Sequence, residues 1–325
     1  MSGVPAQTRS HGRYGFQPVG GFIEPNPANH WEPIHGLPMA MQYAYGSLRA
    51  NDGTYWWPIR GAYADKARFL HLPESAPGTD FVYQPEGDKS YTGPVTHEKR
   101  GDRWGVWLPD GSALLSTDGS TFAWNEADAL DIRGELIGDA LQFFVPDASE
   151  PLVYTSRLFR GSGTIKGIPV TGLFFHDSMH MPAGMNFIKS SYLTALEAAW
   201  VAFATEFEDG TIHAGHLVWG TEGYAIMIVQ RTDGPPIVAR DLSVEVAFDG
   251  LEPPFPAKVW YTGGGETWIW EAHASGGRCP VRTDLPEGHR WIQGWVYRDG
   301  ETRKPVCTEA LMETYNGRLA DVTVG

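Results

Sequence analysis

Large apolar residues alternate with small or polar residues along much of this chain. In segment 39–46, Met39, Met41, Tyr43 and Tyr45 fall on one side of an extended strand, and smaller residues fall on the other. A period of two is typical of a β-strand with one face against a core or a cavity. Such runs are separated by seven Asp-Gly pairs, a strong signal for tight hairpin turns. These pairs begin at Asp52, Asp110, Asp118, Asp209, Asp233, Asp249 and Asp299. The pattern predicts a mainly antiparallel, all-β protein.

Three hairpins can be read directly from these runs. They join 39–49 with 54–59, 211–219 with 223–230, and 259–262 with 267–271. The best helical candidate is 192–199, but it continues without a break into 200–207, which has the composition of a strand. We therefore expect at most one or two short helices.

The length of 325 residues favours two domains. The turn-rich segment 145–151 (Val-Pro-Asp-Ala-Ser-Glu-Pro) is the best candidate for a linker, and each flanking piece is long enough for a small closed sheet. We predict two consecutive β-barrel or sandwich domains, 1–148 with a proline-rich N-terminal arm, and 149–325. An exposed edge strand between the halves could support a homodimer.

The charge of the chain narrows the choice of partners. The formal net charge of -14, from 39 acidic and 25 basic residues, repels phosphate backbones and anionic lipid surfaces, so no nucleic-acid partner is expected. The chain has no run of eighteen apolar residues, and its first ten residues lack the apolar core of a signal peptide. We therefore expect no membrane span and a cytoplasmic location. The two cysteines, Cys279 and Cys307, are too few for a disulfide scaffold.

Segment 170–182 contains the most informative cluster of polar residues. His176, Asp177, Ser178 and His180 come directly after an apolar run that has the composition of a buried strand. If the chain stays extended, the two histidines and the serine share one face and Asp177 points to the other. A bend would instead let Asp177 orient an imidazole. Because ionisable groups are costly to bury without a purpose, His176, Asp177 and His180 are our candidate catalytic residues.

A metal site is a more specific form of the hypothesis that these polar residues are functional. His176 and His180 could be joined by either His213 or His216, with Glu206 as a fourth ligand. However, no spacing matches a known metal signature. The chain also has no glycine-rich dinucleotide loop, Walker motif or nucleophile elbow. We therefore expect neither a cofactor nor a metal.

The N-terminal segment 22–35 concentrates prolines with His30, Trp31, Glu32 and His35 ahead of the first strand. A rigid arm that caps the mouth of a barrel has this composition, and so has an ordinary surface loop. The sequence leaves both possibilities open.

Two stretches resemble a known group of proteins. Residues 172–182 (Gly-Leu-Phe-Phe-His-Asp-Ser-Met-His-Met-Pro) and the hairpin at 203–216 resemble consecutive segments of the lipocalin-like superfamily that includes carotenoid 1,2-hydratases and the so-called secreted hydrolase-like proteins. The resemblance implies two consecutive lipocalin-type antiparallel β-barrel halves over nearly the whole chain. The C-terminal segment 306–315 resembles the closing strand of that group, which implies that Glu309 or Glu313 approaches the core of the second barrel.

The resemblance is incomplete at the candidate site. Asp177 and Pro182 fall on an Asp and a Pro of the group, whereas His176 replaces an Arg, Ser178 a His and His180 a Trp. These differences mean that the resemblance implies the location of the site but not its reaction.

The aromatic content of the chain, with 13 Trp, 13 Tyr and 15 Phe, suits an apolar cavity. We therefore predict a cofactor-free acid-base enzyme: a hydratase or dehydratase, an isomerase or a cyclase. Its substrate would be a hydrophobic small molecule such as a terpenoid, steroid or polyketide. Asp177 or His176 would deliver a proton, provided that burial raises the carboxyl pKa, and His180 would accept one. The predicted substrate-binding residues are Tyr43, Phe175, Trp200, His216 and Trp219.

Two other functions remain open on sequence grounds. The chain could be a non-catalytic carrier that sequesters a hydrophobic ligand in a β-barrel. It could also be a carbohydrate-active β-sandwich, with Glu206 and Glu208, or Glu309 and Glu313, as a carboxylate pair.

Overall fold

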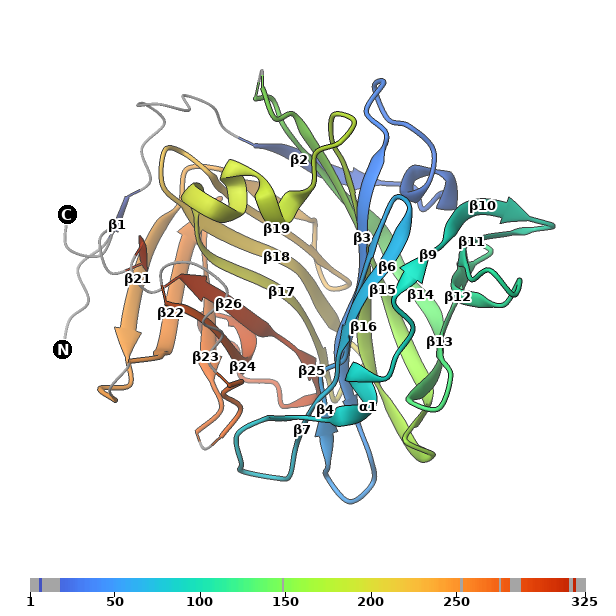
Figure 1. Cartoon of the computed structure of the whole chain (residues 1–325). Helices are drawn as coiled ribbons and strands as arrows, with labels where there is room; N and C mark the ends of the chain where they lie inside the picture. Colours follow the sequence, from blue (N-terminus) through green and yellow to red (C-terminus); the bar gives the residue numbers. More distant parts are fainter. Residues whose placement is uncertain are drawn as a thin grey trace.

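Nearly all regular structure in this protein is β-strand (Figure 1). The computed structural model describes residues 6–7, 18–147, 149–251, 254–274, 276–280, 288–315 and 318–319. Residues 1–10, which carry no signal-peptide pattern, lie mostly outside these ranges. The helical elements named in the described residues are single turns: η1 (Pro27–His30), α1 (Pro85–Asp88), η2 (Phe187–Lys189) and η3 (Tyr192–Leu196). The all-β prediction is confirmed. No helix in the described ranges has the length and hydropathy needed to span a bilayer.

The first sheet curls into an antiparallel half-barrel, drawn in blue and green in Figure 1. In the described residues it has 15 strands: β2 (Val19–Ile23), β3 (Met39–Arg49), β4 (Tyr55–Trp56), β5 (Ile59–Tyr63), β6 (Lys66–His71), β7 (Pro73–Ser75), β8 (Val82–Tyr83), β9 (Gly93–Pro94), β10 (Thr96–Arg100), β11 (Arg103–Trp107), β12 (Ala113–Thr117), β13 (Thr121–Glu126), β14 (Leu130–Val145), β15 (Leu152–Ile165) and β16 (Ile168–His180). Strand β3 pairs with β16, so the first long strand of the chain lies beside the last strand of this sheet.

The second sheet forms the other curled half, drawn mainly in yellow to red. In the described residues it has 11 strands: β1 (Ala6–Gln7), β17 (Glu197–Phe207), β18 (Ile212–Gly220), β19 (Ala225–Arg231), β20 (Ile237–Ala239), β21 (Ser243–Phe248), β22 (Pro256–Gly263), β23 (Glu266–Ala272), β24 (His289–Arg298), β25 (Pro305–Glu309) and β26 (Leu311–Tyr315). Strand β17 is its centre, because it pairs with β18 on one side and with β25 and β26 on the other.

The chain changes from the first sheet to the second at 181–196, later than expected. Val145 and Leu152 are cross-strand partners, so the turn-rich segment between them closes the hairpin of β14 and β15. The expected boundary at 148/149 therefore falls inside the first sheet. Turn-forming residues mark a hairpin as readily as a linker, which is why the sequence pattern did not separate the two. The expected helix at 192–199 is also shorter, since η3 ends at Leu196 and β17 begins at Glu197.

The three hairpins read from the sequence are present. Their innermost cross-strand pairs are Arg49 with Tyr55, Trp219 with Ala225, and Gly263 with Glu266. The prediction succeeded because the alternating pattern and the glycine turns are local properties of the chain. Glycine also sets the spacing of β3 and β16, because a Cβ on Gly172 would lie 1.9 Å from the backbone oxygen of Ser47.

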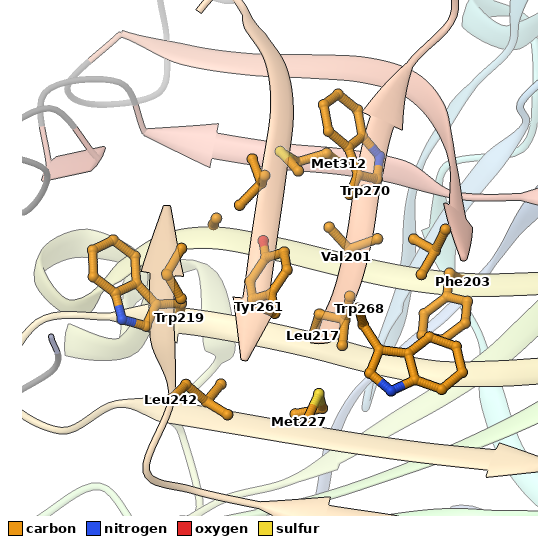
Figure 2. Close-up of a cluster of buried hydrophobic side chains, with 14 of the residues drawn as sticks. Val201, Phe203, Leu217, Trp219, Met227, Leu242, Tyr261, Trp268, Trp270 and Met312 are labelled. Carbon is orange, nitrogen blue, oxygen red and sulfur yellow. The ribbon is translucent and has the colours of Figure 1, made fainter. Parts of the chain in front are cut away.

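Side chains pack in three regions. The interior of the second half is filled by a cluster that includes Trp219, Trp268 and Trp270 (Figure 2). The interior of the first half is filled by a second cluster, which includes Trp56 and Trp124. The remaining buried apolar residues come from both halves and pack between them. The halves therefore meet through the outer faces of their sheets, and this interface contains the candidate site.

Candidate active site between the two halves

Strand β16 divides the polar cluster between its two faces. Phe175 and Met179 pack among residues of both halves, and Asp177, which has the same parity, lies with them. His176 and His180 point the other way and are fully buried within the first half. The strand is regular through this stretch, since each residue from Phe175 to Met179 has a partner on both β15 and β3. The sequence left open an extended chain or a bend at this point, and the structure has the extended chain.

A cavity of about 350 Å³ lies between the halves beside Asp177. Its volume is in the range of small-molecule sites. The first half contributes β3, β5, β6, β15 and β16 to its wall, and the second half contributes η2, η3, β17, β24 and β26. Nine of the lining residues are aromatic, including Tyr43, Tyr45, Trp57, Phe69, Trp200 and Trp291. The cavity also exposes three carboxyl groups, those of Asp177, Glu197 and Glu313.

Asp177 is held in a form suited to carrying a proton. It is 1 % exposed, and burial raises its pKa to about 6. The hydroxyls of Ser156, Tyr154 and Tyr45 act in the opposite direction on this pKa. Tyr154 donates a hydrogen bond to Oδ2, while Oδ1 has no hydrogen-bond partner among the described residues. One carboxyl oxygen is thus fixed by Tyr154, and the hydroxyls of Ser156 and Tyr45 also act on the carboxyl group.

A second buried carboxyl, Glu309 on β25, lies behind the aromatic wall. Its Oε1 accepts a hydrogen bond of 2.8 Å from Nε1 of Trp57, and its Oε2 accepts one from Ser47. Burial raises the pKa of Glu309 to about 7. Because Trp57 lines the cavity, this carboxyl is joined to the wall by a direct hydrogen bond. Glu309 joins the halves, since Ser47 and Trp57 belong to the first half and Glu309 to the second.

The second half supplies its own acidic group at the cavity. Burial, and next the charge of Glu313, raise the pKa of Glu197 well above its usual value. Neither carboxyl oxygen of Glu197 has a hydrogen-bond partner among the described residues. Glu313 is less buried and accepts a hydrogen bond of 2.6 Å from Nε2 of His289. The cavity therefore carries acidic groups from both halves.

Comparison with known proteins places the fold. No protein-family model and no curated protein sequence matches the chain. Among solved structures, a provisionally assigned AttH protein of Nitrosomonas europaea is 15 % identical, with a TM-score of 0.52 over 91 % of this chain and 99 % of that one. Kievitone hydratase of Nectria haematococca is 8 % identical, with a TM-score of 0.50 over 93 % of this chain and 98 % of the hydratase. The fold is lipocalin-like, in two halves. At these identities the likeness shows the fold alone, and it confirms the two-half architecture inferred from the resemblance.

The predicted substrate-binding residues occupy three layers of this lipocalin-like fold. Tyr43 and Trp200 line the cavity. Phe175 and His216 lie one layer behind, where the His216 ring meets Phe175, Tyr154 and Trp200 edge-on at 5.3 to 5.7 Å between centroids. Trp219 is in the interior of the second half, on the opposite face of its sheet from the cavity (Figure 2). Trp219 was expected at the site, and the structure places it elsewhere. The alternation along a strand shows which residues share a face of the sheet, but it does not show what that face packs against.

His176 and His180 do not share the cavity with Asp177. The ring of His176 stacks on His30 at 4.6 Å between centroids, and Nε2 of His180 lies 2.9 Å from the carbonyl oxygen of Glu32. Both contacts come from the N-terminal arm, which packs over this part of the first half. The capping arrangement is therefore found for His30 and Trp31, while Glu32 and His35 stay exposed.

The residues considered for a metal are dispersed. His213 pairs with Asp233, with Nε2 and Oδ1 3.0 Å apart, and Glu206 pairs with Arg160 at 2.6 Å. Neither lines the cavity. Among the described residues, no group of three or more His, Cys, Asp or Glu side chains is placed to hold a metal ion. Glu208, offered with Glu206 as a carbohydrate-type pair, is exposed.

A larger groove of about 870 Å³ lies on the outer face of the first sheet. Its wall is mainly Ser, Thr, Gly and three arginines, Arg103, Arg133 and Arg160. These guanidinium groups are 30 to 60 % exposed, and each is paired with a carboxylate. This groove is a solvated surface, and the groups suited to proton transfer lie in the smaller cavity.

The cavity residues that sequence reasoning missed include Tyr45, Tyr154 and Glu197. Tyr45 belongs to the same alternating face as Tyr43, so the period-two pattern could have placed it there. Tyr154 carries no such signal, because its contact with Asp177 depends on the pairing of β15 with β16. Glu197 was hidden in the expected helix, since a single helical turn before β17 has the same composition as a longer helix.

Asp177 and Glu309 should each make a contribution to the stability of the fold that falls as the pH rises from about 4 towards 7. Asp177 and Glu309 have folded-state pKa values of about 6 and about 7, above the values near 4 of an unfolded chain. In this window the folded protein keeps protons that the unfolded chain has lost, so the stabilising contribution is complete below about pH 4 and is lost as the pH passes through the folded values. Buried histidines such as His30, His176 and His216 act in the opposite direction, because burial lowers their pKa values. The test is therefore the free energy of unfolding of the wild type relative to that of a Glu309→Gln variant, measured by urea denaturation across this range, and this difference should fall as the pH rises. A difference that stays constant with pH would contradict the assignment.

Proposed function

We propose that this protein is a cofactor-free acid-base enzyme that acts on a hydrophobic small molecule in the cavity between its halves. The observation that carries the proposal is Asp177, a buried carboxyl with a raised pKa that Tyr154 orients at the wall of an aromatic cavity. The reaction class is hydration or dehydration of an alkene, isomerisation, or cyclisation. The suggested substrates are terpenoids, steroids or polyketides, whose apolar surface suits the lining.

Asp177 is assigned the role of proton donor. A carboxylic acid can protonate an alkene or a carbonyl only if it holds its proton near neutral pH, and burial provides this condition. Tyr154 fixes the orientation of the carboxyl group through its hydrogen bond. Protonation of an alkene creates a cation, and the ring faces of Tyr43 and Trp200 would stabilise that charge while excluding bulk water.

The proton acceptor is assigned to the opposite half. Glu313 lines the cavity and its orientation is fixed by His289, so its carboxylate can take a proton from water or from a substrate carbon. The role first given to His180 passes to Glu313, because His180 lies on the far face of β16. Acid and base then come from different sheets, and substrate would bind between them.

The proposal is tested by solvent-hydrogen incorporation. The full-length protein is incubated in D₂O with a panel of apolar alkenes, tertiary alcohols and enolisable ketones, and the products are analysed by mass spectrometry and NMR. A proton-transfer enzyme will place deuterium at carbon in at least one compound, because its general acid exchanges with solvent. The Asp131→Asn variant serves as the control and should place deuterium as the wild type does, since Asp131 is on the exposed outside of β14.

The carrier alternative predicts a different result in the same experiment. A carrier would bind panel compounds saturably, as followed by quenching of Trp200 and Trp291 fluorescence, and would return them without deuterium. Binding without exchange over the whole panel would overturn the enzyme proposal and favour the carrier.

A further inference from the structure

Arg157 on β15 is a buried cation without a counter-ion among the described residues. Its side chain points into the first half, on the same face as Phe159, and it is 1 % exposed. Burial lowers its pKa to about 9, so the guanidinium stays charged at neutral pH. The acidic residue that acts on it is Asp118, which is bound to Arg103 at 3.2 Å and lies partly in solvent. A charge this deeply buried is costly unless something compensates it.

The other buried arginine of the same half, Arg60, has its charge compensated by a carboxylate. Arg60 on β5 donates from Nε to Oε1 of Glu126 at 2.5 Å and from Nη2 to Oε2 of the same carboxylate. Its Nη1 donates to the carbonyl oxygen of Tyr91 at 3.1 Å. By contrast, Nε and Nη1 of Arg157 have no partner among the described residues. Its third nitrogen, Nη2, lies 3.3 Å from Nδ1 of His176.

Further unpartnered polar atoms surround Arg157. They are Nε2 of His176, both ring nitrogens of His30, Oγ of Ser178, Nε1 of Trp31 and one acceptor, Oε1 of Gln42, all in buried residues. His176 is the cross-strand partner of Arg157, and Ser178 is the next residue on the same face of β16. The positive charge of Arg157 helps to keep His30 and His176 neutral, since it adds to the effect of burial in lowering both pKa values. Each neutral ring then offers one N–H. Donors therefore dominate this region.

The N-terminal arm closes the region. Trp31 stacks on Trp104 and lies 5.2 Å from His176 between ring centroids, and His30 stacks on the same imidazole. The arm is held by the side chain of Gln42, whose Nε2 donates to the carbonyl oxygen of His30 at 2.7 Å. The groups around Arg157 are all buried, which favours a small ligand over a large organic group.

We infer that the interior of the first half binds one small monovalent anion, of halide size, between Arg157, His176, Ser178 and the His30–Trp31 cap. The anion supplies the counter-charge of Arg157 and accepts hydrogen bonds from the surrounding donors, which is the arrangement that makes a buried charge tolerable. The site lies on the opposite face of β16 from the cavity and is independent of the proposed enzymatic reaction. Its binding stabilises the folded state by mass action.

The test uses the full-length protein and two measurements. Thermal unfolding is followed in increasing sodium chloride against sodium gluconate of equal ionic strength, because gluconate is too large for the enclosed site. Chloride should raise the midpoint saturably in the wild type. Arg157→Met should abolish the difference between the two salts, and Arg160→Met should retain it, since Arg160 lies on the same strand with its side chain half-exposed on the outer face.

Anomalous diffraction from crystals grown in sodium bromide provides the second measurement. A bromide peak within hydrogen-bond distance of the Arg157 guanidinium supports the inference, even if Arg157→Met does not fold. In that case Ser178→Ala, which keeps the cation, should weaken the chloride response. Ordered water without bromide at this position would overturn the inference, and so would equal responses to chloride and gluconate in the wild type.

Discussion

Replacing Asp177 by asparagine is expected to lower kcat by about 10²- to 10⁴-fold on any compound that the wild-type protein converts, the usual contribution of one general acid. The amide keeps the shape of the side chain and can accept the hydrogen bond from Tyr154, but it cannot deliver a proton. The cavity wall is otherwise unchanged, so KM should move little. Steady-state kinetics and a urea melt of the same preparation separate lost chemistry from lost folding. Wild-type turnover by this variant would remove Asp177 from the mechanism.

The tyrosine beside Asp177 offers a more discriminating readout. The Tyr154 hydroxyl acts to lower the pKa of Asp177, against the larger effect of burial. Tyr154→Phe should therefore raise the pKa of the acid and move the alkaline limb of the kcat profile to higher pH, which a purely structural role would not do. His176→Asn is the matched comparison, because this side chain sits next to Asp177 in sequence but faces the opposite side of β16. It should leave the position of that limb unchanged.

The difference between Asp177 and His176 shows how much of the site the sequence predicts. The alternation of side chains in an extended strand is a local rule. For an extended chain it correctly placed Asp177 on the opposite face from His176 and His180. The same rule cannot say which face meets a cavity, because that depends on how the second sheet docks against the first. Trp219 illustrates the limit, since its strand was predicted and its face turned out to point into the second half.

The location of the cavity could not be predicted for the same reason. Each half fills most of its own interior with apolar side chains, so the space for an organic substrate lies where two outer faces meet. Glu197 and Glu313 reach that space from separate strands of the second sheet, and no spacing in the sequence relates them to Asp177. The link of Glu309 to Ser47 and Trp57 likewise depends on how the halves dock. Local patterns predict elements, whereas the site arises from contacts between them.

The Arg60–Glu126 pair should be the most sensitive point for stability in the first half. Both side chains are essentially inaccessible to solvent, and Glu126 also accepts a hydrogen bond of 2.9 Å from Nε1 of Trp124. Removing one partner strands a charge that cannot reach water, at a cost of about 3–5 kcal/mol. We therefore expect Glu126→Gln to lower the free energy of unfolding by that amount, measured from urea denaturation at constant pH. A loss below about 1 kcal/mol, as for an exposed pair, would show that the site is hydrated.

The double variant Arg60→Met/Glu126→Leu decides between two origins of that loss. If it comes from the stranded guanidinium, removing both charges should restore most of the stability, because apolar side chains of similar volume often replace a buried ion pair without loss. If the hydrogen bonds to Trp124 and to the Tyr91 carbonyl contribute more to stability than the charge pair does, the double variant should be less stable than Glu126→Gln, since both groups lose their partners only in the double variant. We expect the double variant to regain most of the stability. Among the described residues, the guanidinium of Arg60 and the carboxylate of Glu126 are the only formal charges in contact here, so removing both leaves no buried charge unpaired.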